Sequence, residues 1–188
     1  MNYKILAIIG QAGSGKDTLM KKVLAINDNL HEVVSFTTRP PREGEVDGVN
    51  YHFIDGEEFG AKVVNGEMLE ASCFNDWFYG TGYESLRSDC VNIGVFNPEG
   101  IDSMMAHGNI DLVVYYVRAK DKTRMLRQLN RENDPDVHEI VRRFKADWID
   151  FEDLDFHYNE IWNEDEKDLS FNVKVLDAAA KRLEARIS

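Results

Sequence analysis

The chain has 188 residues, of which 43% are hydrophobic and 11% aromatic, and it carries a formal net charge of -12. This composition suits one compact domain with a sizeable core, and it excludes a disordered or disulfide-stapled polypeptide. The acidic balance disfavours general affinity for nucleic acid or acidic membranes, because the long-range field repels polyanions. Arginines clustered against this background can still bind a small anion through local contact geometry.

The chain opens with the pattern strand, glycine loop, helix. Residues 3–9 form a mostly apolar run that ends in glycine, as in a strand buried on both faces of a parallel sheet. Over residues 16–26 apolar side chains recur at helical spacing, and residues 27–29 supply stop signals. The apolar run at residues 5–9 is far too short to cross a bilayer.

Strands and helices alternate along the rest of the chain. A polar loop at residues 39–48 follows the second strand, and a polar hinge at residues 133–136 separates two of the helices. The alternation implies an α/β fold with a central parallel β-sheet flanked by helices. The predicted elements are strands at 33–37, 90–96 and 111–117 and helices at 98–107, 121–130, 137–148 and 169–187.

The two cysteines indicate a cellular compartment. Cys73 and Cys90 have no metal-ligand or redox spacing, so they fit a reducing cytosol as ordinary packing residues. We therefore expect a cytoplasmic protein that binds neither nucleic acid nor a membrane. The sequence gives no indication of its oligomeric state.

The strongest mechanistic signal lies between the first strand and the first helix. Glycines there let successive backbone N–H groups turn toward one anion, and the helix N-terminus adds a favourable dipole. Lys16 supplies a positive charge and is a candidate catalytic residue. This context predicts a loop that binds ATP phosphates, and the alternative is a plain strand-to-helix connection. The predicted ATP-binding residues are Gly10, Gln11, Ala12, Gly13, Ser14, Gly15, Lys16, Asp17 and Thr18.

One position of this loop departs from the usual phosphate-loop pattern. The Ser or Thr that normally follows the lysine and contacts Mg²⁺ is replaced by Asp17, and a hydroxyl comes one residue later at Thr18. Thr18 is therefore the candidate Mg²⁺ contact, with a placement of the ion that can differ from the usual one. In this respect the loop resembles that of some monophosphate kinases, in which a non-hydroxyl residue followed by Thr comes after the lysine.

A second anion-binding segment spans residues 35–51, with the sequence SFTTRPPREGEVDGVNY. Arg39 and Arg42 offer planar forks for a phosphate dianion, the intervening prolines limit the freedom of the loop, and Tyr51 can donate a phenolic hydroxyl. The alternative is a solvated turn with incidental charges. The segment closely resembles the signature of the guanylate kinase family.

A third segment resembles the base-binding part of the same family. Glu70 is followed nine positions later by Tyr79, and Thr81 comes two residues after that. A carboxylate can accept from the N1–H and 2-amino groups of guanine, whereas N1 of adenine presents a lone pair that repels it. Glu70 is therefore the candidate for base specificity. The resemblance implies base contacts from Ser35 and Thr81, and acceptor-phosphate contacts from Arg39, Arg42, Tyr51 and Tyr79.

The resemblance weakens at residues 95–100, where the family normally carries two aspartates. Val95 and Asn97 occupy their places. Asn97 can still accept from the guanine amino group through its side-chain oxygen, or it can accept a different purine, and Glu99 is a candidate substitute for one carboxylate.

A basic segment at residues 127–143 is a candidate lid. Arg127 and Arg131 are four residues apart, which places both on one face of the predicted helix, and the following hinge could let the segment fold over bound phosphates. The resemblance implies catalytic lid arginines, with Arg131 and either Arg142 or Arg143 as candidates. The alternative is a set of structural ion pairs with Glu132, Glu139 and Asp147.

The resemblance covers nearly the whole chain. It implies one guanylate-kinase-like domain over residues 1–188, with a P-loop NTPase fold, an inserted subdomain for the nucleoside monophosphate (NMP) and a mobile lid. The implied bounds are 1–34, 88–126 and 144–188 for the core, 35–87 for the NMP-binding subdomain and 127–143 for the lid.

The implied activity is transfer of the γ-phosphoryl group of ATP to GMP or dGMP, with Mg²⁺ as cofactor. A phage-type or broader (deoxy)nucleoside monophosphate kinase stays open, suggested by Asp17 and Asn97. A non-catalytic module that binds proteins through the same surface is the third alternative. Such a module is expected to lose the phosphate loop, whereas this chain keeps Lys16.

Overall fold

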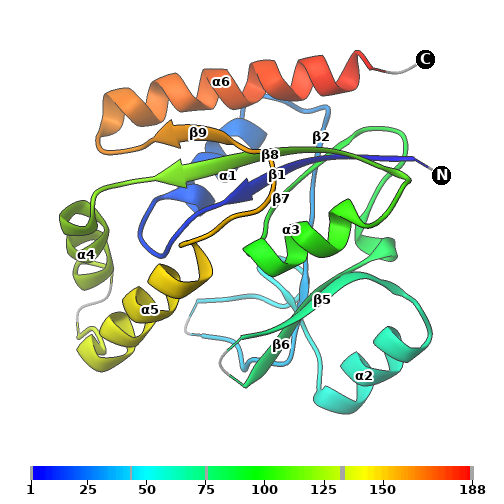
Figure 1. Ribbon diagram of the computed structural model, residues 1–188, viewed down its shortest axis with the longest axis horizontal. Coiled ribbons are helices and arrows are strands. Elements are labelled where there is room, and N and C mark those ends of the chain that lie inside the picture. Colours follow the sequence, from blue (N-terminus) through cyan, green and yellow to red (C-terminus); the bar gives the residue numbers. More distant parts are fainter. Residues whose placement is uncertain (1, 43, 75, 132–133, 187–188) are drawn as a thin grey trace.

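A five-stranded parallel sheet forms the centre of the computed structural model, which describes residues 2–42, 44–74, 76–131 and 134–186 (Figure 1). Its strand order is β2-β7-β1-β8-β9, and every neighbouring pair is parallel. The expected α/β fold with a central parallel sheet is confirmed. The strands are β1 (Tyr3–Ile9), β2 (Leu30–Glu32), β7 (Val91–Val95), β8 (Ile110–Arg118) and β9 (Asn159–Trp162).

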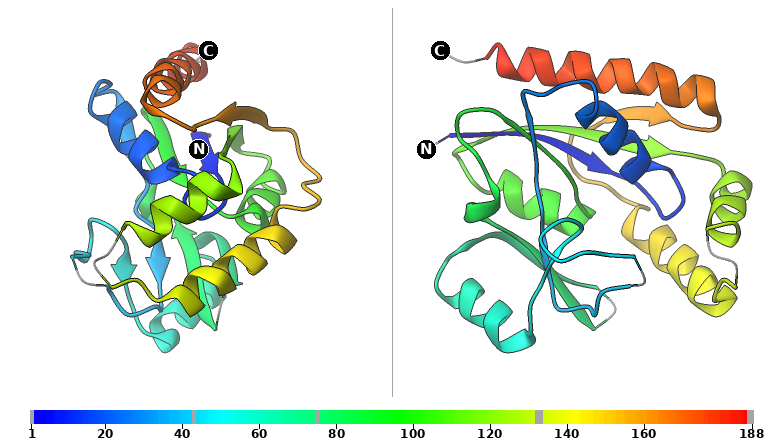
Figure 2. Two further views of the ribbon diagram at one scale, coloured as in Figure 1. Left: turned by 90° about the vertical axis from the view of Figure 1, so that its left-hand side faces the viewer. Right: turned by 180° about the vertical axis from the view of Figure 1, so that it is seen from behind.

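Helices cover both faces of this sheet, as Figures 1 and 2 show. Leu6 and Ile8 of β1 pack against α1 (Lys16–Leu24) and α6 (Glu166–Glu184) on one face. Ile5, Ala7 and Ile9 of the same strand belong to a second cluster, which includes α3 (Pro98–Met105). Because alternate side chains of a strand point to opposite faces, an uninterrupted apolar strand is what two covered faces require.

A smaller four-stranded sheet lies below the central one in Figure 1. Its order is β4-β3-β6-β5, in which β3 pairs parallel with β4 and antiparallel with β6. The helix α2 (Gly56–Val64) packs against it through the buried Phe59. The strands are β3 (Phe36–Thr37), β4 (His52–Phe53), β5 (Met68–Phe74) and β6 (Trp77–Gly82), and a 3-10 turn at Tyr83–Ser85 leads back to β7.

Two helices follow β8 on the left of Figure 1. They are α4 (Asp121–Leu129) and α5 (Val137–Asp150). The Asp136 side chain caps α5 by accepting from the Glu139 N–H group at 3.1 Å. Asn133 of the predicted hinge lies outside the described residues.

Most predicted elements are confirmed with shifts of one to three residues, but the strand at 33–37 is wrong. The chain there forms β2 and β3, which belong to different sheets. Val33 still donates to the Ile93 carbonyl of the central sheet, whereas the Ser35 carbonyl accepts from His52 of the small sheet. The apolar run is continuous, but its hydrogen-bond partners change halfway.

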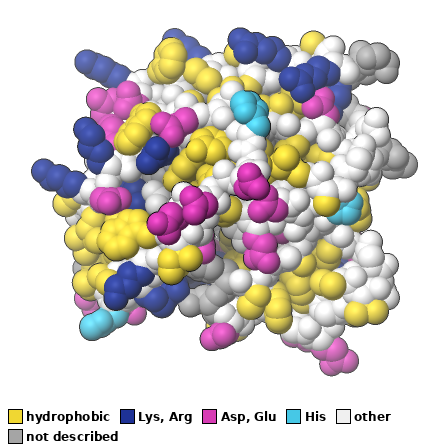
Figure 3. All heavy atoms as spheres, viewed as in Figure 1, with side chains coloured by type: hydrophobic (Ala, Val, Ile, Leu, Met, Phe, Trp, Pro, Cys, Tyr) yellow, Lys and Arg dark blue, Asp and Glu magenta, His cyan; other side chains and the backbone are white. Residues whose placement is uncertain are grey.

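The surface over α4 and α5 carries a group of apolar side chains (Figure 3). It includes the half-exposed Trp148 and Val141. None of the described helices combines the length and the apolar character that a bilayer crossing requires.

Cys73 is exposed and Cys90 partly exposed, so the expectation that both are packing residues is wrong for Cys73.

Candidate functional site

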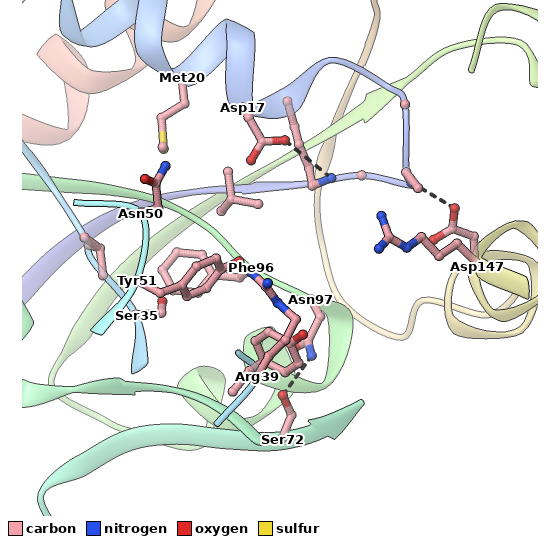
Figure 4. A pocket seen from close by; sticks show the side chains of 18 of the residues that line it. Asp17, Met20, Ser35, Arg39, Asn50, Tyr51, Ser72, Phe96, Asn97 and Asp147 are labelled. Atoms are coloured by element: carbon pink, nitrogen blue, oxygen red, sulfur yellow. Dashed lines mark hydrogen bonds and ion pairs between the residues drawn. The ribbon is translucent and has the colours of Figure 1, made fainter. Parts of the chain in front are cut away.

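A cleft of about 410 Å³ lies between the two sheets, at the carboxyl ends of β1 and β7 (Figure 4). Its lining draws on the glycine loop, the segment after β3, the strands β5 and β6, the turn after β7, and α5. Most predicted site residues meet there. Those that line the cleft are Gly10, Ala12, Gly13, Lys16, Asp17, Ser35, Arg39, Arg42, Tyr51, Glu70, Tyr79, Asn97, Arg131 and Arg143.

The glycine loop turns sharply between β1 and α1. Gly13 and Gly15 adopt positive φ values of 79° and 90°, which side chains with a Cβ atom rarely tolerate. At Gly13 a Cβ atom would also lie 2.6 Å from the Arg124 carbonyl oxygen. These two positions therefore need glycine for the turn itself.

Side chains from outside hold the loop by its backbone. Arg124 is completely buried and donates to the Ala12 carbonyl at 3.0 Å, and Arg127 donates to the Gly13 and Ser14 carbonyls at 3.2 and 3.1 Å. Asn163 donates to the Ser14 carbonyl at 2.8 Å. These contacts fix the carbonyls away from the cleft, which favours N–H groups directed toward an anion.

A carboxylate on α5 joins the same support. Asp147 accepts from the Ala12 N–H group at 2.8 Å and from the Arg124 guanidinium. Arg124 also donates to Gln11 Oε1 at 2.9 Å. Gln11 thus supports the loop from outside the cleft lining, and Ala12 N–H is directed to Asp147 in this structure.

Lys16 and Asp17 open helix α1 at the donor end of the cleft. The Lys16 ammonium lies 3.9 Å from the Asp17 carboxylate, and the Lys16 side chain is 19% exposed. Thr18 is exposed and does not line the cleft. The Asp17 carboxylate is therefore part of the cleft lining, whereas the Thr18 hydroxyl, the predicted Mg²⁺ contact, is outside it.

Positive charge converges at the acceptor end. Arg39 is 9% exposed and lies over the Tyr51 ring at 5.6 Å, and its guanidinium binds both oxygens of Glu45 at 2.9 and 3.0 Å. Burial and the nearby charges of Arg143 and Arg39 lower the pKa of Arg42. Three guanidinium groups from two segments therefore act on one region of the cleft, which favours an anion there.

Two tyrosines accompany these arginines. The rings of Tyr51 and Tyr79 meet edge to face with centroids 6.1 Å apart. Burial, reinforced by the charge of Asp17, raises the pKa of Tyr51 to about 12. The phenol therefore stays protonated at physiological pH and can donate to a bound oxyanion. Asp17 and Tyr51 line the same cleft, so its donor and acceptor ends are continuous.

A buried carboxylate occupies the far end. Glu70 is 7% exposed, and its Oε1 atom accepts from the Thr81 hydroxyl at 2.7 Å. Burial raises the pKa of Glu70 to about 7, although the Thr81 hydrogen bonds oppose the shift. Thr81 is itself fully buried behind Glu70, so it positions the carboxylate instead of lining the cleft.

Asn97 occupies the turn between β7 and α3. Its side-chain oxygen caps α3 by accepting from the Gly100 N–H group at 2.8 Å, and its amide group donates to Ser72 Oγ at 2.8 Å. Figure 4 shows the second contact as a dashed line. Val95 also lines the cleft, and it offers no polar group.

The candidate lid arginines occupy three different settings. Arg127 donates to carbonyl groups of the glycine loop. Because α4 ends at Leu129, Arg131 lies outside the helix, and the prediction that Arg127 and Arg131 share one helical face is wrong. Arg131 follows the helix, is exposed and lines the cleft. Arg142 and Arg143 both bind Glu139, at 2.7 and 2.8 Å.

These ion pairs match part of the alternative explanation for the lid arginines. The hydrogen bond from Arg142, together with the weaker effect of the one from Arg143, lowers the pKa of Glu139 to about 2. Asp147 pairs with Arg124 instead of a lid arginine, and Glu132 lies outside the described residues. Only Arg143 of the neighbouring pair lines the cleft.

Several contributing residues were not predicted from the sequence. Arg124 and Asn163 support the glycine loop, Glu45 binds Arg39, and Ser72 binds Asn97. The only signal for Glu45 is its place inside the 35–51 segment. The others act through partners far away in the sequence, and no sequence motif indicates them.

Comparisons with known proteins agree with this geometry. The guanylate kinase family model matches residues 2–176. The guanylate kinase of Campylobacter jejuni strain RM1221 is 32% identical over 146 residues, covering 75% of this chain and 71% of that protein. The guanylate kinase of Ruegeria sp. strain TM1040 is 30% identical over 183 residues, covering 94% of this chain and 84% of that protein.

Two further matches differ in extent. The Clostridioides difficile strain 630 guanylate kinase is 49% identical over 90 residues, so this alignment spans only 43% of that relative and 48% of this chain. The crystal structure of guanylate kinase from Anaplasma phagocytophilum has the same fold, with a TM-score of 0.67 at 22% identity over 98% of this chain and 95% of that one. With the family model matched over nearly its whole length, the chain belongs to the guanylate kinase family.

Proposed function

We propose that this protein transfers the γ-phosphoryl group of ATP to GMP or dGMP, giving ADP and GDP or dGDP. The observation that carries the proposal is one cleft with a glycine loop and Lys16 at one end and Arg39, Arg42 and Glu70 at the other. Phosphoryl transfer requires two aligned nucleotides and neutralised charge more than covalent help from the protein. The position of these groups in one cleft supports both requirements.

The donor end binds ATP by its phosphates. Backbone N–H groups of the glycine loop and the Lys16 ammonium hold the β and γ phosphates, and the outer contacts of Arg124 and Arg127 keep the loop in shape. Mg²⁺ bound with ATP would neutralise part of the phosphate charge. Asp17 is the side chain whose carboxylate suits that ion, and the fit rests on its position beside Lys16 in the cleft.

The acceptor end binds the monophosphate and the base. Arg39, Arg42 and the protonated Tyr51 hold the phosphate, with Tyr79 alongside. Glu45 holds Arg39 in a fixed orientation, so that less side-chain entropy is lost when the phosphate binds. Glu70 in its ionised form accepts from N1–H and the 2-amino group of guanine.

The reaction is an in-line displacement. An oxygen of the GMP phosphate attacks the γ-phosphorus of ATP, the bond from that phosphorus to the β–γ bridging oxygen breaks, and ADP leaves with the electron pair. The attacking phosphate is already ionised, so the step needs no general base. Lys16 and the guanidinium groups stabilise the charge on the equatorial oxygens in the transition state.

Arg143 is the lid arginine that we assign to the transferring phosphoryl group, with Arg131 as a second cation. It lines the cleft and acts on Arg42, whereas Arg142 does not line the cleft. When Arg143 leaves Glu139 for the phosphoryl group, the carboxylate stays paired with Arg142, so the move leaves no unpaired charge behind. On this proposal, residues 35–87 and 127–143 close over the core 1–34, 88–126 and 144–188.

A coupled assay of ADP release tests the proposal. The substrates are GMP, dGMP, AMP, CMP, UMP and dTMP, each with ATP and Mg²⁺. Turnover with GMP and dGMP, and little with the others, is the expected result. Turnover with several bases would favour the broader monophosphate kinase, which the Asn97 amide at the base end suggests. Absence of turnover together with absence of ATP binding by calorimetry would refute both and favour a protein-binding module.

A further inference from the structure

The orientation of the Asn97 amide is fixed by the helix that it caps. Its side-chain oxygen accepts from the Gly100 N–H group at 2.8 Å, so the NH₂ group must be the end that faces Ser72. An NH₂ group can only donate. Ser72 Oγ is therefore the acceptor in that contact, and its own proton is left to point elsewhere.

Ser72 lies at the base end of the cleft. The residue is 5% exposed and lines the cleft, and it lies two positions after Glu70 on β5. Side chains two apart on a strand lie on the same face, about 7 Å from one another along the chain. Among the hydrogen bonds of the described residues, none takes up the Ser72 hydroxyl proton.

The two other hydroxyls near Glu70 have their protons committed. Thr81 donates to Glu70 Oε1 at 2.7 Å. Ser35 Oγ lies 3.2 Å from Thr81 Oγ1, and because the Thr81 proton goes to Glu70, Ser35 must be the donor in that pair. Ser72 is thus the hydroxyl of this group whose proton is available to a ligand.

Guanine has an edge that requires such a donor. Its N1–H and 2-amino groups donate, which suits Glu70, whereas its O6 and N7 atoms only accept. We infer that Ser72, oriented by Asn97, donates a hydrogen bond to the O6 or N7 atom of the bound guanine. The inference rests on the proposed function and adds Ser72 as a specificity residue and Asn97 as its positioning residue.

The test compares Ser72 variants on three nucleotides. Dissociation constants are measured by calorimetry for GMP, for 7-deaza-GMP, which lacks N7, and for 6-thio-GMP, which lacks O6 but keeps the N1–H and 2-amino groups. Ser72→Ala is expected to weaken GMP binding about tenfold, the size of one lost hydrogen bond. With the analogue that lacks the contacted acceptor, wild type and Ser72→Ala are expected to bind equally.

Two further variants separate this role from a structural one. Ser72→Cys keeps the shape and can still accept from Asn97, but its S–H group is a weak donor, so it is expected to lose affinity as Ser72→Ala does. It serves as the same test if the alanine variant fails to fold in a thermal melt. Ser103→Ala removes a hydroxyl that donates to the Glu99 carbonyl outside the cleft, and it is expected to bind all three nucleotides normally.

Two outcomes overturn the inference. One is unchanged GMP affinity in both Ser72 variants, and the other is the same loss for GMP and for both analogues. A wild-type protein that binds GMP in either case leaves the proposed function standing. A wild-type protein that neither binds nor phosphorylates GMP refutes the proposed function itself.

Discussion

Glu70→Gln should separate the stability of the protein from its affinity for guanine as the pH changes. Burial raises the pKa of Glu70 from 4.5 to about 7. The folded state therefore holds a proton that the unfolded state has released between these two values. Because the folded state binds more protons there, the free energy of unfolding must fall as the pH rises through this window.

The size of the effect follows from the shift. At 1.36 kcal/mol per pKa unit, the change from 4.5 to about 7 corresponds to about 3 kcal/mol. Glutamine has the same shape, stays neutral and can accept from Thr81, so it avoids this loss. We expect Glu70→Gln to match wild type near pH 4.5 and to be more stable by about 3 kcal/mol at pH 8.

Affinity for GMP is expected to run in the opposite direction. Only the ionised carboxylate accepts two hydrogen bonds from guanine, so GMP binding by wild type should strengthen as the pH rises toward 8. Glu70→Gln presents an amide donor to the guanine edge and should lose most GMP activity at every pH.

Urea unfolding of both proteins at several pH values between 4.5 and 8 gives the stability difference, which cancels the titration of all other groups. Calorimetry with GMP gives the affinity. A stability difference that does not change with pH would refute the reasoning, because it would mean that burial does not shift this carboxyl group. An unchanged preference for GMP over AMP in the variant would remove Glu70 from base recognition.

Three further substitutions test other parts of the cleft. Lys16→Met should abolish turnover, by about 10³-fold or more, with an unchanged circular dichroism spectrum, and near-normal turnover would discredit the donor site. Arg143→Ala should lower kcat about 10²-fold, whereas Arg142→Ala should lower it less than about fivefold, and equal effects in a steady-state assay would contradict the assignment of Arg143. Arg124→Met should destabilise the protein by about 3 to 5 kcal/mol in urea unfolding because it leaves Asp147 buried without its partner, and a loss below about 1 kcal/mol would contradict the clamp.

The donor loop and the acceptor arginines could be predicted because each set is contiguous in sequence. Local spacing placed Lys16 at the start of a helix and Arg39 in a stiff loop, and the cleft contains both. Glu70 could be predicted from its distance to Tyr79, since both lie on paired strands of one hairpin, where spacing is fixed by the turn.

The remaining features depend on partners that spacing does not reveal. Arg124 lies in a polar helix, a position that predicts an exposed side chain. It is fully buried instead, because Asp147 on the next helix supplies its countercharge. The break between β2 and β3 depends on which neighbours accept the hydrogen bonds of Val33 and Ser35. Local pattern carries no information on either point.

Asp147 is the residue through which α5 is attached to the donor loop. The carboxylate is fastened to the Ala12 N–H group, and Arg143 stands one helical turn away, about 6 Å along the axis. A tilt of the helix about Asp147 would move Arg143 by less than it moves Val137 at the far end of the helix. A ligand that shifts Ala12 while this hydrogen bond is kept would move Asp147 as well, which connects the donor end of the cleft to the helix that carries Arg143.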